Sequence, residues 1–341
     1  MSNLNSDPSN YQLEGREFIV VGGAGYIGAH VCKMIAQQGG RPIVFDNFSA
    51  GHKHAVKWGP SVNVDLRDRA MTLAAFKTYA HVKTIIQRAS FIEVGEGERA
   101  PEEFYENNVL GALNLLMAMR AVGADRLIFS STCAVYGETQ YMPLVESEAQ
   151  IPFSVYGKTK LAIEHMIQSY HKAYDLDYVT FRYFNAAGAD ASGEIGEEHD
   201  PETHLIPNAL KAAARLGPKL NLFGTDYPTP DGTCVRDYIH VTDIARAHIQ
   251  AIRAQDEGLR QAELNLGTGA GYSVLQIIKV VETITGLPVP YIAAPRRAGD
   301  LTQLYADALR AKEVIGFTAQ HSSLENIIST AWNFHRTKWG L

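Results

Sequence analysis

A glycine-rich turn between an apolar strand and a helix constrains the fold of this chain more than any other feature. The predicted strand is Phe18 to Val21, the turn is Gly23-Ala24-Gly25-Tyr26-Ile27-Gly28, and the predicted helix runs from Ile27 to Gly39. Glycines in such a G-x-G-x-x-G turn let the main chain approach a pyrophosphate at the helix N-terminus, where free N–H groups face the anion. Asp46 ends the next predicted strand, about 20 residues further on, where a carboxylate can hold the ribose hydroxyls of adenosine. The turn therefore predicts a dinucleotide site, and Asp46 favours NAD over NADP because it would repel a 2′-phosphate.

Strands alternate with longer helical patterns through the first half of the chain. Apolar runs at 41–46, 82–87 and 178–183 read as strands, and 101–123 and 156–174 read as helices. This alternation predicts an α/β fold with a Rossmann-like, doubly wound parallel sheet that helices cover on both faces. After residue 185 the chain becomes rich in loop-forming residues. We therefore predict a cofactor-binding Rossmann domain over residues 15–185 and a smaller α/β substrate-binding domain formed mainly by 186–341, with some segments returning to the first sheet.

Charge and cysteine content exclude several classes of protein. The 341 residues include 31 basic and 37 acidic side chains, which give a formal charge of -6. A nucleic-acid-binding protein usually has the opposite sign or a dense basic tract, and the sequence has neither. The three cysteines form no C-x-x-C pair, which excludes a disulfide framework and fits a reducing, cytoplasmic location. No apolar stretch approaches the roughly 20 residues that span a bilayer, so we expect no membrane partner.

A tyrosine–lysine pair is the strongest candidate for chemistry. In Tyr156-Gly157-Lys158-Thr159-Lys160 the phenol and the ammonium lie four residues apart, on one face of the predicted helix. A free phenol has a pKa near ~10 and is a poor base at neutral pH. A neighbouring lysine and a positively charged nicotinamide ring would both lower that pKa. Ser130-Ser131-Thr132 ends a predicted strand upstream, and a hydroxyl there can bond both the phenol and a substrate oxygen.

These motifs together resemble those of the extended short-chain dehydrogenases/reductases and, within that superfamily, the UDP-glucose 4-epimerase family. Further matches are Asn107-Asn108-Val109, Arg182-Tyr183-Phe184-Asn185 and the run from Phe223 to Val241, the last being specific to the epimerase branch. The resemblance extends from about Glu17 to Trp339. It implies an NAD-dependent isomerase that interconverts UDP-hexoses at C4, such as UDP-glucose and UDP-galactose, through a 4-keto intermediate.

The resemblance also implies a role for each matched residue. Tyr156 takes the proton of the sugar 4-hydroxyl, Lys160 holds the nicotinamide ribose and tunes Tyr156, and Thr132 steadies the 4-oxygen. The implied NAD contacts are Gly23, Gly25, Tyr26, Ile27, Gly28, Asp46, Asn47, Asp65, Leu66, Asn107, Tyr156 and Lys160. The implied contacts to the UDP-sugar are Thr132, Asn185, Phe223, Arg236, Arg297 and Asp300. Two alternatives stay open: Asp65 could equally cap the following helix, and Arg236 could pair with Asp237.

One stretch departs from the family pattern. The family has His-Phe-Ala-Gly or His-Phe-Ala-Ala at the end of the fourth strand, soon followed by a lysine near the cofactor. Here the run is Gln87-Arg88-Ala89-Ser90-Phe91-Ile92-Glu93, with Arg88 at the aromatic position and Ile92 at the lysine position. We expect weaker cofactor retention or a shifted substrate, unless Arg88 supplies the missing cation.

The sequence leaves some other substrates open and disfavours two other functions. A UDP-pentose 4-epimerase, acting on UDP-xylose or UDP-arabinose, would share every catalytic feature. Leu304 stands where relatives vary a pocket-wall residue, and its middling bulk leaves UDP-N-acetylhexosamines open. A dehydratase is disfavoured because Cys133-Ala134 replace the acid–base pair of that branch. A non-catalytic NAD-binding regulator is disfavoured because such proteins often lose the tyrosine–lysine pair.

Two further expectations concern metal binding and the assembly of the chain. The histidine pairs His52/His54 and His199/His204 lack ligand partners at convincing spacing, so solvated histidines and no metal are expected. Relatives dimerise through the helices that correspond to 101–123 and 156–174, which predicts a homodimer.

Overall fold

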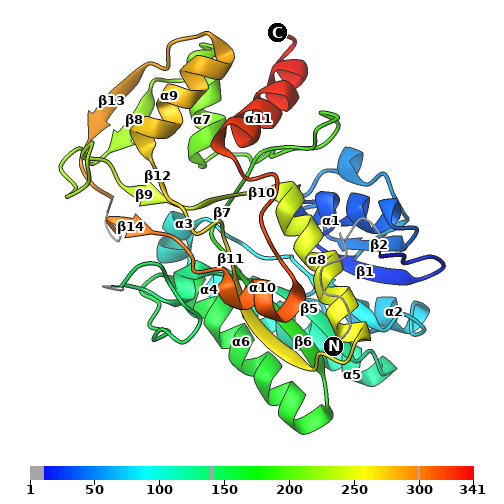
Figure 1. Ribbon diagram of the computed structural model, residues 1–341. Coiled ribbons are helices and arrows are strands. Elements are labelled where there is room, and N and C mark those ends of the chain that lie inside the picture. The colour runs from blue at the N-terminus through cyan, green and yellow to red at the C-terminus, as the bar shows by residue number, and fades with distance from the viewer. Residues whose placement is uncertain (1–10, 139–140, 298–299) are drawn as a thin grey trace.

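The structure, a computed structural model, describes residues 11–138, 141–297 and 300–341, and its centre is a parallel sheet of seven strands. The strand order is β11-β6-β5-β4-β1-β2-β3 (Figure 1). The strands are β1 (Glu17–Val21), β2 (Arg41–Asp46), β3 (Ser61–Asn63), β4 (Thr84–Gln87), β5 (Arg126–Thr132), β6 (Asp177–Tyr183) and β11 (Gln261–Leu266). Every neighbouring pair is parallel. The predicted Rossmann-like sheet is therefore confirmed.

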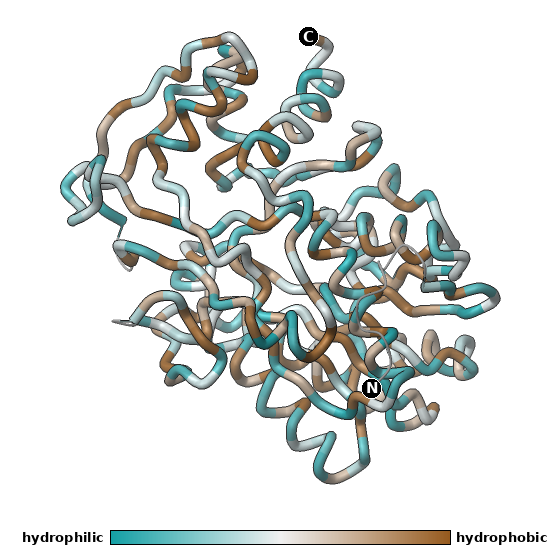
Figure 2. Tube along the Cα trace, in the orientation of Figure 1, coloured by the Kyte–Doolittle hydropathy of each residue, from teal (hydrophilic) through white to brown (hydrophobic). Residues whose placement is uncertain are grey.

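Helices cover both faces of this sheet because successive side chains of a strand point to opposite sides. In β1, Phe18 and Val20 pack on one face, and Ile19 and Val21 on the other. The first face is covered by α1 (Tyr26–Gln37), α8 (Val241–Asp256) and α10 (Leu309–Ile315). The second is covered by α2 (Arg69–Thr78), α5 (Gly111–Val122) and α6 (Val155–Tyr174). Figure 2 shows that hydrophobic residues concentrate in the central strands, as expected for a sheet buried on both sides.

The helical stretch predicted over 101–123 is divided. After α3 (Val94–Arg99) come α4 (Pro101–Phe104), a π-helical turn over Tyr105–Leu110 and then α5. π-helical turns are rare and often occur at functional sites. This one carries Asn107 and the fully buried Asn108.

The rest of the chain forms a smaller group of helices and short sheets. Its core joins α7 (Leu205–Ala213), α9 (Val274–Thr285) and α11 (Leu324–Trp339). The short sheets pair β7 (Asn185–Ala187) with β10 (Tyr238–His240), β8 (Leu220–Phe223) with β13 (Tyr291–Ala294), and β9 (Val235–Arg236) with β12 (Tyr272–Ser273) and β14 (Gln303–Leu304). No helix among the described residues has the length and apolar character needed to cross a bilayer.

The strand order reverses direction at β1, which lies between β2 and β4. In doubly wound sheets, ligands bind in the crevice outside the carboxyl ends of the strands at this switch point. The glycine turn follows β1, Arg88 follows β4, and Thr132 ends β5. The fold thus brings these predicted site residues to one edge of the sheet.

Candidate active site

The glycine turn packs too tightly for side chains at three positions: Gly22, Gly23 and Gly28. Gly22 has a φ of +76°, and a Cβ there would lie 2.6 Å from the Ala89 nitrogen; a Cβ on Gly28 would lie 2.1 Å from the Gly22 oxygen. At Gly25 a Cβ would meet only the Gly22 oxygen, at 3.5 Å. Gly25 is also the N-cap of α1, and no side chain caps that helix. The first N–H groups of α1 therefore stay available to an anion, which fits the pyrophosphate of a dinucleotide.

Asp46 lies against this turn. Its carboxylate accepts hydrogen bonds from the main-chain nitrogens of Ala24 at 3.0 Å and Phe48 at 2.8 Å. Burial raises the pKa of Asp46, and the two N–H groups oppose that rise. Each carboxylate oxygen has two lone pairs, so acceptor capacity remains for ribose hydroxyls. The donor set fits the adenosine end of NAD.

Asp65, two residues after the end of β3, does not cap α2. The cap is Asp68, whose side chain accepts from the Met71 nitrogen at 2.9 Å. Asp65 instead pairs with Arg67 at 2.6 Å and accepts from the Asn47 amide at 3.4 Å. The hydrogen bond to Arg67 lowers the pKa of Asp65 to about 2. The helix-cap alternative for Asp65 is therefore wrong, because Asp68, three residues later, caps α2.

Asn108 positions the loop after β4 and was not predicted as a site residue. Its side chain accepts from the Phe91 nitrogen at 2.8 Å and donates to the Phe91 oxygen and to Thr159 on α6, both at 3.1 Å. Asn107, a predicted cofactor contact, donates to the Asn108 side chain at 3.0 Å. Leu66, another predicted cofactor contact, is buried. The signal in the sequence was a polar amide pair within an otherwise apolar helical pattern.

The three predicted catalytic residues lie together at the end of β5. The Tyr156 hydroxyl shares a hydrogen bond with the Thr132 side chain. Lys160, 3% exposed, donates from Nζ to the Ser130 main-chain oxygen at 2.8 Å. Its Nζ lies 5.8 Å from the centre of the Tyr156 ring. Ser154 caps α6 with its side chain, so Tyr156 and Lys160 occupy the first turns of that helix, beside the end of β5.

Burial shifts the pKa values of both Tyr156 and Lys160 in the direction that disfavours their charged forms. Burial raises the pKa of Tyr156 above its ordinary value, and the hydrogen bond to Thr132 opposes this only in part. Burial and, to a smaller extent, the positive charge of Arg88 together lower the pKa of Lys160 to about 7. Lys160 Nζ donates to Ser130, and the positive charge of Arg88 lowers the pKa of Tyr156.

Arg88 therefore belongs to the site. Its guanidinium donates to the Ser130 hydroxyl at 2.7 Å and to the Tyr183 hydroxyl at 2.9 Å, and it lies 5.2 Å from the centre of the Tyr183 ring. The same Tyr183 hydroxyl lies 3.2 Å from His248 Nε2. Arg88 thus carries a positive charge to the carboxyl ends of β4, β5 and β6. Ile92, at the family's lysine position, is half-buried in the loop that follows.

Three predicted substrate residues meet around one carboxylate. Asp300 lies 3.4 Å from Arg236 and 2.9 Å from Arg297. The Arg297 guanidinium lies 5.0 Å from the centre of the Phe223 ring. Asp237 instead accepts from the main chain of Thr268 at 2.9 Å and from its hydroxyl at 2.6 Å. The alternative pairing of Arg236 with Asp237 is therefore wrong. Two guanidinium forks beside each other suit phosphate oxygens.

A small apolar cluster joins the catalytic and substrate groups. Cys133, which follows Thr132, packs with Phe184, and Leu304 packs against them. Leu304 is the strand partner of Arg236. Asn185, next to Phe184, hydrogen-bonds the Tyr238 hydroxyl. The predicted catalytic and substrate residues therefore converge on one region, at the carboxyl edge of the large sheet.

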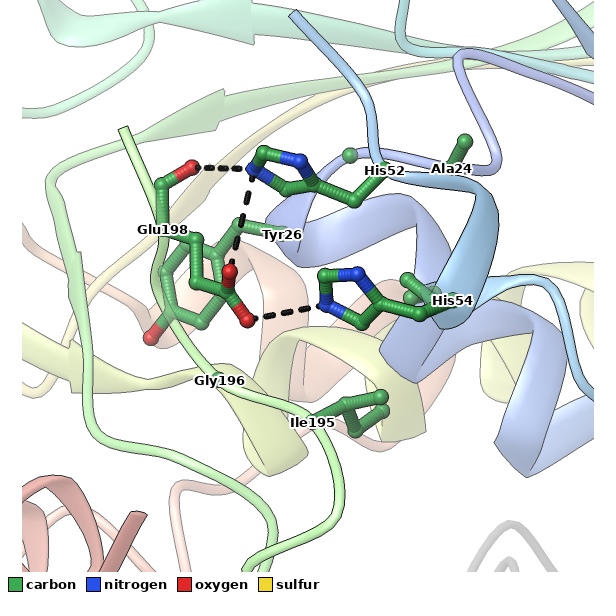
Figure 3. Close-up of a pocket in the computed structure, with 10 residues that line it drawn as sticks. Ala24, Tyr26, His52, His54, Ile195, Gly196 and Glu198 are labelled. Carbon is green, nitrogen blue, oxygen red and sulfur yellow. Dashed lines mark hydrogen bonds and ion pairs between the residues drawn. The ribbon is translucent and has the colours of Figure 1, made fainter. Parts of the chain in front are cut away.

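A pocket borders the other side of the glycine turn (Figure 3). Ala24, Gly25 and Tyr26 line it from the turn, and Glu198 lines it from the segment between β7 and α7. The Tyr26 hydroxyl donates to the Gly188 oxygen at 2.6 Å. The Tyr26 side chain thus holds this segment, while its main chain belongs to the turn.

The fold and this site together define a dinucleotide-binding α/β protein with a tyrosine–lysine pair at the switch point of its sheet. Residues 18–267 match the NAD dependent epimerase/dehydratase family, and the chain belongs to that family. It is 47% identical over 326 residues to a UDP-glucose 4-epimerase of Rhizobium leguminosarum bv. trifolii, covering 95% of this chain and 98% of the relative. A crystal structure of UDP-glucose 4-epimerase from Brucella ovis in complex with NAD is similar, with a TM-score of 0.91, 48% identity and coverage of 94% of this chain and 98% of that one. A UDP-glucose-4-epimerase from Stenotrophomonas maltophila with bound NAD and formylated UDP-arabinopyranose also has a TM-score of 0.91, with 37% identity over 95% of this chain and 99% of that one.

Proposed function

We propose that this protein is an NAD-dependent UDP-glucose 4-epimerase, which interconverts UDP-glucose and UDP-galactose through a 4-keto intermediate. The observation that carries the proposal is the meeting of Tyr156 and Thr132 at the end of β5, close to the Arg236–Asp300–Arg297 group. Relatives similar over nearly the whole chain bear this name. One region therefore offers a proton-transfer group and a diphosphate-binding group.

The cofactor site follows from the glycine turn and Asp46. The first turn of α1 would bind the pyrophosphate through Gly25, Tyr26, Ile27 and Gly28, and Asp46 would hold the adenosine ribose with Asn47 nearby. Asp65, Leu66 and Asn107 would complete that contact surface. When bound, NAD supplies a reversible acceptor for the hydride of C4.

The chain's own residues handle the proton and the position of the sugar. Tyr156 takes the proton of the 4-hydroxyl and, once the 4-keto sugar has turned its opposite face to the cofactor, returns the proton to the 4-oxygen, while Thr132 bonds that oxygen. Asn185 and Arg236 bind the diphosphate, Arg297 and Asp300 bind the diphosphate and the uridine ribose, and Phe223 completes the substrate contacts. Firm binding of the UDP part lets the 4-keto sugar turn within the pocket between the two half-reactions. Because burial raises the pKa of Tyr156, its deprotonation depends on positive charge nearby, which Arg88 provides in part.

The proposal is tested by incubating the purified protein with UDP-glucose, UDP-galactose, UDP-xylose, UDP-arabinose and UDP-N-acetylglucosamine, without added reductant, and separating the C4 epimers. We expect UDP-glucose and UDP-galactose to reach the same mixture from either side. Preferential conversion of a UDP-pentose or of the N-acetylated sugar would show that this sugar, and not a UDP-hexose, is the preferred substrate. Binding of NAD without conversion of any sugar would contradict the enzymatic proposal and favour the regulator.

The wider organisation is part of the same proposal. Residues 15–185 bind the cofactor, and residues 186–341 mainly bind the nucleotide sugar. The chain acts as a homodimer, because apolar side chains remain exposed near α4 and α6: Tyr105 at 43%, Leu110 at 42% and Phe153 at 48%. The cysteines Cys32, Cys133 and Cys234 are free and buried, which suits the cytoplasm. Light scattering after gel filtration measures the oligomeric state.

A further inference from the structure

Two glutamates and two histidines meet in the segment between β7 and α7, outside the proposed active site. The Glu197 Oε1 atom lies 2.9 Å from His204 Nδ1 and 3.4 Å from His199 Nδ1. Glu202 lies 3.3 Å from His204 Nδ1 and 3.8 Å from His199 Nδ1. One ligand atom from each of these four side chains lies within 4.8 Å of the other three.

These separations match a tetrahedral metal centre. Zinc binds histidine nitrogen and carboxylate oxygen at about 2.0–2.2 Å, which puts the ligand atoms of a tetrahedron about 3.4 Å apart. Both histidines present Nδ1, so both rings turn the same atom toward one point. Imidazole suits zinc and other transition metals, whereas calcium and magnesium prefer oxygen ligands throughout.

The burial of the two carboxylates supports a ligand between them, although the His204 side chain itself is 45% exposed. The side chains of Glu197 and Glu202 are 5% and 4% exposed, and within the described ranges neither forms an ion pair with a lysine or arginine. His199 Nδ1 is buried and has no hydrogen-bond partner among the described residues. Two buried carboxylates need a compensating positive charge. A divalent cation between the four side chains would supply that charge and use the open nitrogen.

We propose that Glu197, His199, Glu202 and His204 form a zinc site with four protein ligands. A site closed by four protein ligands is structural rather than catalytic. Its place in the fold indicates what it stabilises. The His199 ring meets the Tyr26 ring edge-on at 6.5 Å, and Tyr26 belongs to the glycine turn. The metal would fix the segment 188–204 against the cofactor-binding turn.

The neighbouring group of His52, His54 and Glu198 provides a matched control. Its ligand atoms also lie close together, and the two rings stack at 5.1 Å (Figure 3). It offers three ligands instead of four, and Glu198 is already paired with Lys338. His52 and His54 lie between β2 and β3, whereas His199 and His204 lie between β7 and α7, and of these two groups only the second offers four ligands among the described residues.

The test is the zinc content of the tag-free full-length protein, expressed with zinc, dialysed against metal-free buffer and analysed by mass spectrometry. We expect one zinc ion per chain in the wild type and in the His52→Gln/His54→Gln variant. The His199→Gln/His204→Gln variant should lose most of its zinc. Equal zinc in both double variants, or none in the wild type after stoichiometric zinc is added, would overturn the proposal.

A second measurement separates metal loss from misfolding. Cobalt added to the chelator-treated wild type should give the strong visible absorption of tetrahedral cobalt, which one equivalent of zinc removes. Zinc should also raise the thermal midpoint of the wild type, because a ligand that binds only the native state stabilises it. In the metal-free alternative, burial disfavours the charged imidazoles, but the carboxylates raise the pKa of His199 to about 9 and of His204 to about 10. That state would show no cobalt spectrum and no zinc-dependent midpoint, and finding it would refute the site.

Discussion

Replacing Tyr156 with phenylalanine removes one oxygen atom from the proposed proton-transfer site and leaves the ring in place. That hydroxyl has one side-chain partner, Thr132, among the described residues. The chain also offers a matched control in Tyr136, another buried phenol just after β5. The Tyr136 hydroxyl donates to Asn265 at 2.6 Å and accepts from Arg182 at 2.9 Å. The two substitutions delete the same atom in chemically different places.

We expect Tyr156→Phe to lower turnover more than Tyr136→Phe does, and Tyr136→Phe to lower the free energy of unfolding more than Tyr156→Phe does. Tyr156→Phe loses one neutral hydrogen bond, which contributes about 0.5–1.5 kcal/mol to the free energy of unfolding. Its turnover should fall by about 10²- to 10⁴-fold, the usual contribution of a positioned acid–base group. Tyr136→Phe loses two hydrogen bonds, one of them to a buried guanidinium, so its free energy of unfolding should fall by about 2–4 kcal/mol. The Tyr136 hydroxyl bonds other buried side chains, so turnover of the folded fraction should stay close to that of the wild type.

The assay measures conversion of UDP-galactose to UDP-glucose, together with urea unfolding and the NAD content of each variant. Tyr156→Phe should bind NAD as the wild type does. If it retains more than about one-tenth of wild-type turnover, its hydroxyl cannot be the proton-transfer group, since that loss is smaller than such groups contribute. A drop in turnover of equal size in both variants would show that the effect is structural.

Four further substitutions or conditions test other parts of the site. Gly28→Ala should abolish NAD binding, measured by fluorescence titration, because its Cβ would lie 2.1 Å from the Gly22 oxygen. Leu304→Gly should raise kcat/KM for UDP-N-acetylglucosamine relative to UDP-glucose if Leu304 forms the pocket wall, and an unchanged ratio would remove it from that wall. Arg88→Gln removes a charge that lowers the pKa of Tyr156, so the acidic limb of the kcat/KM profile should move to higher pH; an unchanged limb would contradict this. Finally, the free energy of unfolding from urea titrations should fall as pH decreases from about 6.5 to about 4, by up to ~1.4 kcal/mol per pH unit for each buried neutral histidine, because the unfolded chain takes up protons that the native state excludes. Burial lowers the pKa of His30, His240 and His335 to about 4 and that of His248 to about 3.

The fold could be predicted because its signals are local. The apolar runs at 18–21 and 41–46 and the glycines between them lie within one short stretch, and each run forms the predicted strand. The tyrosine–lysine spacing is also local, since a helix places residues four apart on one face. These features fix the seven-stranded sheet and the position of Tyr156 beside the end of β5.

Some features could not be predicted because they join segments that lie far apart in the sequence. Others could not be predicted because they depend on which of two nearby residues takes a given role. Arg236 and Asp300 are 64 residues apart and meet because two-residue strands pair in a small sheet. The cap of α2 is Asp68 instead of Asp65, which spacing alone did not separate. Glu197 and Glu202 come to His199 and His204 in a loop without a repeating period. A pattern search based on helix or strand spacing cannot find such a cluster.

The departure at Arg88 and Ile92 moves a positive charge instead of removing it. The lysine position of the family is the half-buried Ile92, while Arg88 carries its guanidinium to the ends of β4, β5 and β6. A guanidinium stays charged at every working pH, whereas burial lowers the pKa of Lys160 to about 7, so Lys160 loses part of its charge near neutrality. The charge of Arg88 lowers the pKa of Tyr156. We therefore predict that losing the family's lysine weakens NAD retention without a matching loss of acidity in the phenol, because Arg88 still acts on Tyr156.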